Sequence, residues 1–155
     1  MSCEYSCERG LRKEIAGGRS GRMARFQCEC RTIGDMRSFE NLAVWRRAHA
    51  LAIAVEESAF RFPRRRYTTL IGQLTRSAES IAANIVEGSG AATQKEFARY
   101  LDISIKSASE TQYHLLAARD RGALPEADWQ SLNEEVIEIR RMTFGLRNKI
   151  LSSAQ

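Results

Sequence analysis

The feature that most constrains the fold is the spacing of apolar residues in the last part of the chain. From Trp129 onward, one face is marked at alternating steps of three and four residues, namely Trp129, Leu132, Val136, Ile139, Thr143, Leu146 and Ile150. This is the repeat of a helix that packs lengthwise against other helices in a left-handed bundle. Because such a stripe must be buried, the segment predicts a helical bundle.

Three earlier segments show the same helical period. The first spans about 42–61 and stops before Pro63, because proline disfavours helical geometry in the preceding residue. Ser38 or Asn41 is expected to cap this helix. The second segment spans about 66–87 and stops at the glycines of 88–90. The last segment begins near Pro125, a favourable residue for a first helical turn.

The third segment, from about 93 to 122, has the clearest start. The sequence Thr93-Gln94-Lys95-Glu96 predicts a capping box. In this motif the Thr93 hydroxyl accepts a hydrogen bond from the Glu96 N–H, and the Glu96 carboxylate accepts one from the Thr93 N–H. We therefore expect a helix that starts directly after Thr93.

Four such segments with short connections predict an all-α, antiparallel, up-down-up-down four-helix bundle over residues 38–155. The whole chain of 155 residues has only two prolines and ten glycines, too few turn-forming residues for a many-stranded sheet. Several apolar or small residues exceed what the inner faces need: Val44, Leu51, Ile53, Ala82, Ala83 and Val86. A broad core or a contact between protomers would explain them, and both interpretations stay open.

Residues 1–37 have no periodic apolar face. We expect a disordered tail or an upstream extension, with Met36 as an alternative start of translation. All four cysteines lie in this tail, at Cys3, Cys7, Cys28 and Cys30. Their spacing departs from the two-residue gaps of common zinc sites, so a structural zinc is the less favoured interpretation. We expect no metal and no cofactor.

The charge balance by itself says little about partners. The net charge is +5, but residues 1–37 hold eight basic and five acidic residues, a net +3, which leaves +2 for residues 38–155. The chain has no run of about 18 apolar residues and no apolar core of a secretory signal near its start. We therefore expect a cytoplasmic protein without membrane contact.

Motifs for catalysis are missing from the predicted bundle. Its two histidines, His49 and His114, have no second ligand at helical spacing. Neither a phosphate-binding loop nor the Glu-x-x-His pairs of di-iron bundles occur. The sequence therefore predicts a protein that is not an enzyme.

The most unusual segment reads Phe60-Arg61-Phe62-Pro63-Arg64-Arg65-Arg66-Tyr67. Arginine side chains interleaved with aromatic rings could clamp phosphates and stack on bases. A solvated loop whose aromatic residues cover the end of the bundle would have the same composition. Both interpretations stay open at this point.

Several stretches carry a resemblance to a known family: 39–49 with Phe62-Pro63, 73–88, 94–101, 107–110 and 113–115. Together they resemble the bacterial four helix bundle protein family over about 36–150. Members of that family include proteins encoded within intervening sequences of 23S ribosomal RNA genes. The family also resembles the accessory variability determinant of diversity-generating retroelements, a homopentamer that binds a reverse transcriptase and nucleic acid. The resemblance thus implies a pentamer here.

Within these stretches, Asn84 and Glu87 are the most distinctive polar pair, and Glu110 belongs to a further matching stretch. Polar groups on an apolar helix face need partners. We expect Asn84, Glu87 and Glu110 to connect helices or protomers, with direct ligand contact as the alternative. Arg66 stands where the family commonly has glutamate, which makes the segment after Pro63 more basic.

Two functions follow. The first is a non-catalytic homo-oligomer, pentameric by resemblance, which binds RNA or DNA, with a ribonucleoprotein or a reverse transcriptase as a further partner. Its contact residues would be Arg61, Arg64, Arg65, Arg66 and Tyr67. The second is an oligomeric scaffold for a protein partner that never contacts nucleic acid. The small net charge of residues 38–155 favours the scaffold, and the arginines favour nucleic acid.

Overall fold

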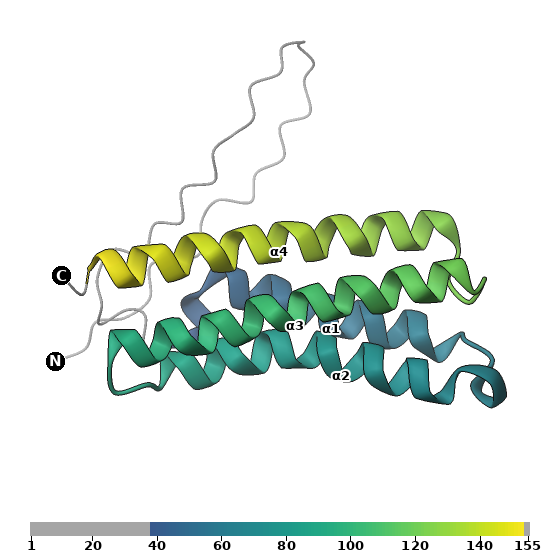
Figure 1. The fold of residues 1–155 in the computed structure, drawn as a ribbon, viewed down its shortest axis with the longest axis horizontal. Coiled ribbons are helices and arrows are strands. Elements are labelled where there is room, and N and C mark those ends of the chain that lie inside the picture. Colours follow the sequence, from purple (N-terminus) through teal and green to yellow (C-terminus); the bar gives the residue numbers. More distant parts are fainter. Residues whose placement is uncertain (1–37, 154–155) are drawn as a thin grey trace, which may run out of the picture.

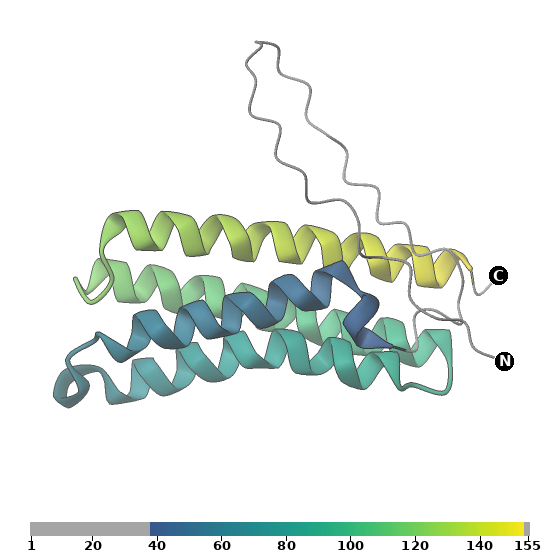
Figure 2. The same ribbon diagram turned by 180° about the vertical axis from the view of Figure 1, so that it is seen from behind.

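The chain forms four antiparallel helices that pack lengthwise, as Figure 1 and the reverse view in Figure 2 show. This computed structural model describes residues 38–153. A short 3-10 helix, η2 (Phe39–Asn41), precedes α1 (Ala43–Phe60), α2 (Arg64–Ser89), α3 (Gln94–Asp120) and α4 (Glu126–Ser152). Residues 38–153 contain no strand. The all-α four-helix bundle is confirmed, whereas the predicted disordered tail and its cysteines lie outside the described residues.

The start of α3 follows the predicted capping box in one of its two bonds. Thr93 Oγ1 accepts a hydrogen bond from the Glu96 N–H at 3.1 Å. The Glu96 carboxylate accepts from the backbone N–H of Ala92, at 3.2 Å, and not from that of Thr93. The extended backbone at Thr93, with φ −128° and ψ 153°, brings the preceding amide to the carboxylate. The predicted donor of the second bond, the Thr93 N–H, was therefore wrong by one residue, because the donor is the Ala92 N–H.

The start of α1 differs from the prediction that Ser38 or Asn41 caps it. The cap residue is Leu42, which makes no side-chain cap hydrogen bond. Asn41 belongs to η2, and Leu42 is almost fully buried. The Leu42 side chain at the cap position packs into the core. Its burial stabilises the fold by more than the roughly 1 kcal/mol that a polar cap contributes.

The connection from α1 to α2 is shorter than the sequence predicts. Pro63 is the cap of α2, which begins at Arg64 and not near residue 66. The N–H groups of Arg66 and Tyr67 both donate to the Pro63 carbonyl, at 3.0 and 3.1 Å. Tyr67 has a non-helical backbone, with φ −124° and ψ 19°, so α2 is kinked after its first turn. Arg64 and Arg65 are therefore helical residues.

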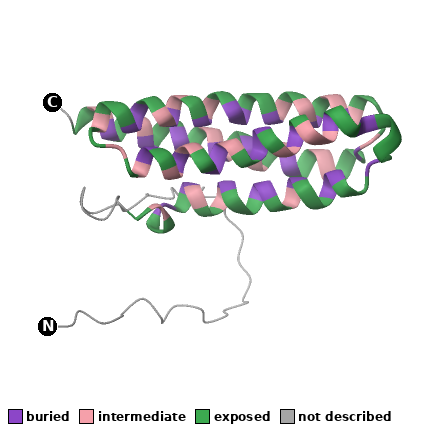
Figure 3. Ribbon diagram, turned by 90° about the horizontal axis from the view of Figure 1, so that it is seen from below, coloured by how far each residue is buried: buried purple, intermediate pink, exposed green. Residues whose placement is uncertain are grey.

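The core runs along the whole bundle, as the buried positions in Figure 3 show. Six of the seven predicted inner positions of α4 are buried, and Trp129 is half-buried: the six are Leu132, Val136, Ile139, Thr143, Leu146 and Ile150. Among the surplus apolar residues, Val44, Leu51 and Ala82 are buried and so belong to a broad core. Ile53 and Ala83 are exposed, so a core role does not explain them.

Candidate functional site

The α1–α2 and α3–α4 turns lie at the same end of the bundle (Figure 1). Tyr67 Oη donates a hydrogen bond to the Arg121 carbonyl at 2.8 Å. Arg61 Nη2 lies 2.9 Å from Asp128 Oδ2. At the turn after α3, Gly122 adopts a φ of 69°, which a glycine accepts without strain. We call this region the arginine end and define it by Arg61, Arg64, Arg65, Arg66, Arg119 and Arg121.

Two arginines of the arginine end are already neutralised by carboxylates. Arg61 pairs with Asp128, and Arg119 pairs with Asp120 at 2.8 Å while its guanidinium lies 4.1 Å from the Trp129 ring centroid. The other four are exposed and form no ion pair with any residue of 38–153: Arg64, Arg65, Arg66 and Arg121. Four positive charges on one end of the bundle therefore lack a counterion within the described chain.

Local helix electrostatics add to this positive charge. Arg64, Arg65 and Arg66 occupy the first turn of α2, which contains no acidic residue and has no side-chain cap. The N-terminus of a helix carries a partial positive charge, and its first N–H groups lack helical partners. Cations at this position repel the helix dipole, so this end of α2 is less stable than an acidic first turn would be and attracts anions.

The aromatic residues of the segment divide into buried and exposed ones. Phe62 and Tyr67 are buried, and their rings pack edge to face with centroids 6.5 Å apart. The Tyr67 ring fills the end of the core and its hydroxyl is bonded, so a contact between Tyr67 and nucleic acid stays a prediction. These two rings cover this end of the bundle, Phe62 from the connection and Tyr67 from α2. Phe60 is 67% exposed and is the aromatic ring of this segment that solvent reaches.

The Asn84 side chain bonds within α2, to Ser80 one turn earlier, so its predicted role in connecting helices or protomers stays a prediction. Its Nδ2 donates to the Ser80 carbonyl at 2.7 Å and to Ser80 Oγ at 3.0 Å. Ser80 Oγ in turn shares a hydrogen bond with Ser107 Oγ of α3 at 2.9 Å. Asn84 thereby orients the serine that makes the link between the helices.

Glu87 and Glu110 make no hydrogen bond or ion pair with another helix in the described part of the chain. Glu87 is exposed, and its carboxylate has no hydrogen bond or ion pair with another residue of 38–153. Glu110 Oε1 lies 3.6 Å from His114 Nε2, one turn further along α3. Both carboxylates are thus directed to solvent, where a contact between protomers remains a prediction.

A set of buried hydroxyl groups lies between α2 and α3 and was not predicted from the sequence. Thr111 Oγ1 donates to Ser77 Oγ at 3.1 Å, and Ser104 Oγ donates to the Ile81 carbonyl at 2.9 Å. Small polar residues at 104, 107 and 111 share the helical spacing of the apolar stripe of α3, which is the signal that could have identified them. The short side chains let the two helices approach closely.

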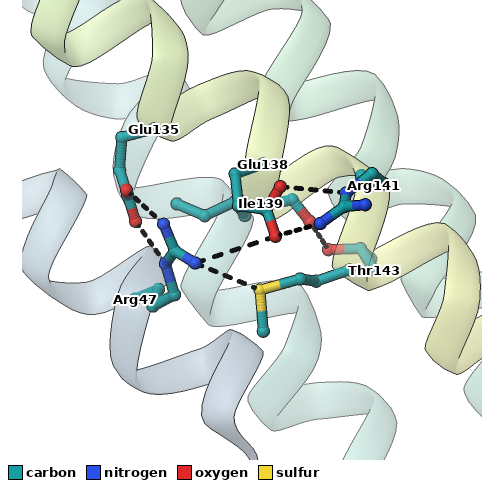
Figure 4. A network of polar contacts seen from close by, with 7 residues as sticks. Arg47, Glu135, Glu138, Ile139, Arg141 and Thr143 are labelled. Atoms are coloured by element: carbon teal, nitrogen blue, oxygen red, sulfur yellow. Dashed lines mark hydrogen bonds and ion pairs between the residues drawn. The ribbon is translucent and has the colours of Figure 1, made fainter. Parts of the chain in front are cut away.

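The contact between α1 and α4 is polar at its rim, as Figure 4 shows. Arg47 Nε lies 2.7 Å from Glu135 Oε1, and Arg47 Nη1 lies 3.8 Å from Glu138 Oε1. The hydrogen bond to Glu135 raises the pKa of Arg47, and the hydrogen bond from Arg141 lowers the pKa of Glu138. This network connects α1 with α4 at the surface of the bundle.

Other kinds of site find no support in the described residues. Residues 38–153 contain no group of three or more His, Cys, Asp or Glu side chains arranged to hold a metal ion. None of the four helices is both long enough and apolar enough to cross a membrane. His49 is exposed and stacks on Trp45, with ring centroids 5.3 Å apart.

The fold and the arginine end define a small helical bundle protein with a concentrated positive end. The chain belongs to the 23S rRNA-intervening sequence protein family, whose model matches residues 40–145. A crystal structure from Bacteroides thetaiotaomicron, of a protein with unknown function from the S23 ribosomal protein family, is similar with a TM-score of 0.63. The two sequences are 25% identical, over 68% of this chain and 95% of that chain. No curated protein matches the chain.

Proposed function

We propose that this protein is a non-catalytic homo-oligomer, a pentamer, which associates with nucleic acid or a ribonucleoprotein in the cytoplasm through its arginine end. The observation that carries the proposal is the group of four exposed arginines that form no ion pair with the described residues 38–153: Arg64, Arg65, Arg66 and Arg121. The guanidinium fork matches phosphate geometry, and it stays charged at every physiological pH. The family name, which refers to an intervening sequence of 23S rRNA, supports the same class of partner.

The turns supply phosphate contacts without any base-reading element. The arginines project from a helix terminus and a turn, so no helix presents a row of side chains to the edges of bases. Binding would therefore depend on charge and vary little with base sequence. Contacts of this kind displace counterions, which makes the affinity strongly dependent on salt.

Exposed apolar side chains support the oligomer. Ile53 of α1 is 45% exposed, and Ala83 of α2 is exposed beside Asn84. Association would cover part of this surface. A ring of protomers would also repeat the arginine end, so several weak phosphate contacts would act together on one strand.

An oligomeric scaffold for a protein partner is the second candidate. It is favoured by the charge of residues 38–155, where sixteen basic residues oppose fourteen acidic residues, a net +2. Outside the six arginines of the arginine end, ten basic residues oppose fourteen acidic residues, and a surface with this charge balance gives no long-range attraction for nucleic acid. The two functions differ in whether the arginine end binds phosphate.

Anisotropy titrations with a labelled RNA oligonucleotide test the proposal. If four to six phosphates are contacted, the affinity of the wild-type protein should fall about a hundredfold to a thousandfold between about 50 and about 200 mM salt. The triple variant Arg64→Ser, Arg65→Ser, Arg66→Ser should lose binding at low salt while keeping its helicity. Absence of wild-type binding at about 50 mM salt would favour the scaffold.

A variant with the same charge change provides the matched control. Lys95, Arg99 and Lys106 are exposed residues of α3, with Lys95 and Arg99 in the turns next to the opposite end of the bundle. Replacing all three with serine removes the same three charges. This variant should bind RNA nearly as well as the wild-type protein. An equal loss in both triple variants would show that net charge, and not the arginine end, governs binding.

A further inference from the structure

We infer that the arginine end prefers a single strand over a duplex, because one unpaired base stacks on Phe60. This inference rests on the proposed function and deepens it by naming the class of nucleic acid. It starts from the position of Phe60, the last residue of α1, which directly precedes Arg61.

Phe60 is unusual in its exposure. At 67% it is the most exposed large apolar side chain in the described part of the chain. The two neighbouring aromatic residues, Phe62 and Tyr67, turn inward and are buried. Two of the three aromatic rings in residues 60–67 are therefore buried, and the Phe60 ring is exposed to solvent. In this position the Phe60 ring adds nothing to the core.

The ring lies among the exposed cations. The Arg64 guanidinium carbon is 4.6 Å from the centroid of the Phe60 ring, a cation–π contact that joins the end of α1 to the start of α2. Arg65 and Arg66 follow in the same helical turn and are exposed. An aromatic surface at the end of α1 and several cations in the first turn of α2 thus occur together at the connection between the two helices.

This combination matches the chemistry of single-strand binding. Proteins that bind single strands without sequence preference combine cationic side chains for the backbone with aromatic rings on which bases stack. In a duplex the base faces are covered by neighbouring bases, so Phe60 could not reach them. Phosphates occur in both forms, which means that the arginines alone would not distinguish them.

The width of the arginine end fits a short stretch of a single strand of nucleic acid. Neighbouring helices pack at about 8–10 Å, so the end of a four-helix bundle is about 20 Å across. A surface of that width contacts only a few nucleotides of each strand. Stacking of one base per protomer would then add a substantial share of the binding energy and would tolerate any base.

Two labelled oligomers of equal charge test the inference in the full-length protein. One is an oligothymidine of about 12 nucleotides, and the other is an abasic deoxyribose-phosphate oligomer of the same length. At about 50 mM salt the wild-type protein should bind oligothymidine about tenfold more tightly than the abasic oligomer. A duplex of the same length should behave like the abasic oligomer, apart from the effect of its second strand of charge.

Variants of Phe60 test whether this ring causes the preference for oligothymidine over the abasic oligomer. Phe60→Leu should bind both oligomers equally, with unchanged affinity for the abasic one, and Phe60→Trp should keep the preference. Phe144→Leu is the matched control, because Phe144 is also exposed, at 54%, and lies in the C-terminal half of α4, away from the arginine end. This control should behave as the wild-type protein does.

The outcomes separate the inference from the proposed function. Equal wild-type affinity for both oligomers would overturn the stacking inference and leave phosphate binding intact. A preference retained in Phe60→Leu, or lost in Phe60→Trp, would also overturn it. No wild-type binding to either oligomer would overturn the inference together with the proposed function.

Discussion

The hydroxyl of Tyr67 donates a hydrogen bond to the backbone carbonyl of Arg121 at 2.8 Å, and this bond joins the two turns at the arginine end. The bond holds the α3–α4 turn beside the first turn of α2. Arg121 therefore lies at the same end of the bundle as Arg65 and Arg66, although more than fifty residues separate them in sequence. Tyr67 therefore positions the arginines and does not itself face solvent.

Removing this hydroxyl should weaken the fold modestly. Tyr67→Phe keeps the buried ring and loses one hydrogen bond, so the free energy of unfolding should fall by about 1 kcal/mol. Tyr113→Phe is the control, because Tyr113 is 62% exposed and its hydroxyl makes no hydrogen bond with the described chain. Denaturant unfolding measures both variants. Equal stability of the two would contradict a structural role for the bond.

Glycine at position 88 should be required for the approach of α2 to α3. A Cβ at Gly88 would lie 2.8 Å from Phe97 Cε2 and 2.9 Å from Tyr100 Cβ, closer than real contacts allow. Gly88→Ala should therefore destabilise the protein by about 1–3 kcal/mol.

Alanine should have the opposite effect on stability at a helical glycine that has open space around it. A Cβ at Gly145 would have no neighbouring atom within 4 Å. Gly145→Ala should stabilise the protein by about 0.5–1 kcal/mol, because alanine loses less backbone entropy in a helix. Thermal melts should shift in opposite directions for the two variants. A Gly88→Ala protein as stable as the wild type would show that the helices pack less closely than described.

Acid should remove the contribution of Glu138 to stability. The hydrogen bond from Arg141, assisted by Arg47, lowers the pKa of Glu138 below its usual range. A carboxyl whose pKa is lower in the folded state stabilises the fold above its unfolded pKa, and this stabilisation is lost as the pH falls through the folded pKa. The free-energy difference between wild type and Glu138→Gln should thus shrink from neutral pH to about pH 3.

Urea unfolding at several pH values measures this change. Glu134→Gln is the control, because Glu134 is exposed on the same helix and has no ion pair within the described chain. Its stability difference from the wild type should stay nearly constant over the same pH range. A constant difference for Glu138→Gln would mean that its ion pairs do not persist in solution.

The purified protein should be a closed oligomer, with five subunits expected. Native mass spectrometry at micromolar concentration determines the number. Ala83→Arg places a long cation on the exposed face beside Asn84 and should reduce the assembly to monomers without loss of helicity, whereas Ala127→Arg, at an exposed position in the first turn of α4, should not. A monomeric wild-type protein would leave Ile53 and Ala83 as ordinary surface residues and remove the argument from repeated arginine ends.

The sequence by itself determined the helices and their inner faces. The alternating steps of three and four from Leu132 to Ile150 can be satisfied only by a helix that buries one stripe, and all of these positions are buried. Thr93 and Glu96 likewise marked the start of α3, because a cap depends on residues close in sequence. Local signals of this kind do not depend on the rest of the fold.

Tertiary structure decided the roles of residues whose partners are distant in sequence. Tyr67 and Phe60 are both aromatic residues that flank the arginines of residues 60–67, yet the Tyr67 ring is buried beside the α3–α4 turn and the Phe60 ring is exposed. Arg61 and Arg65 are equally basic, but only Arg61 meets a carboxylate, that of Asp128, from another helix. Burial and ion pairing depend on which surfaces come together when the four helices pack, and no pattern within one segment contains that information.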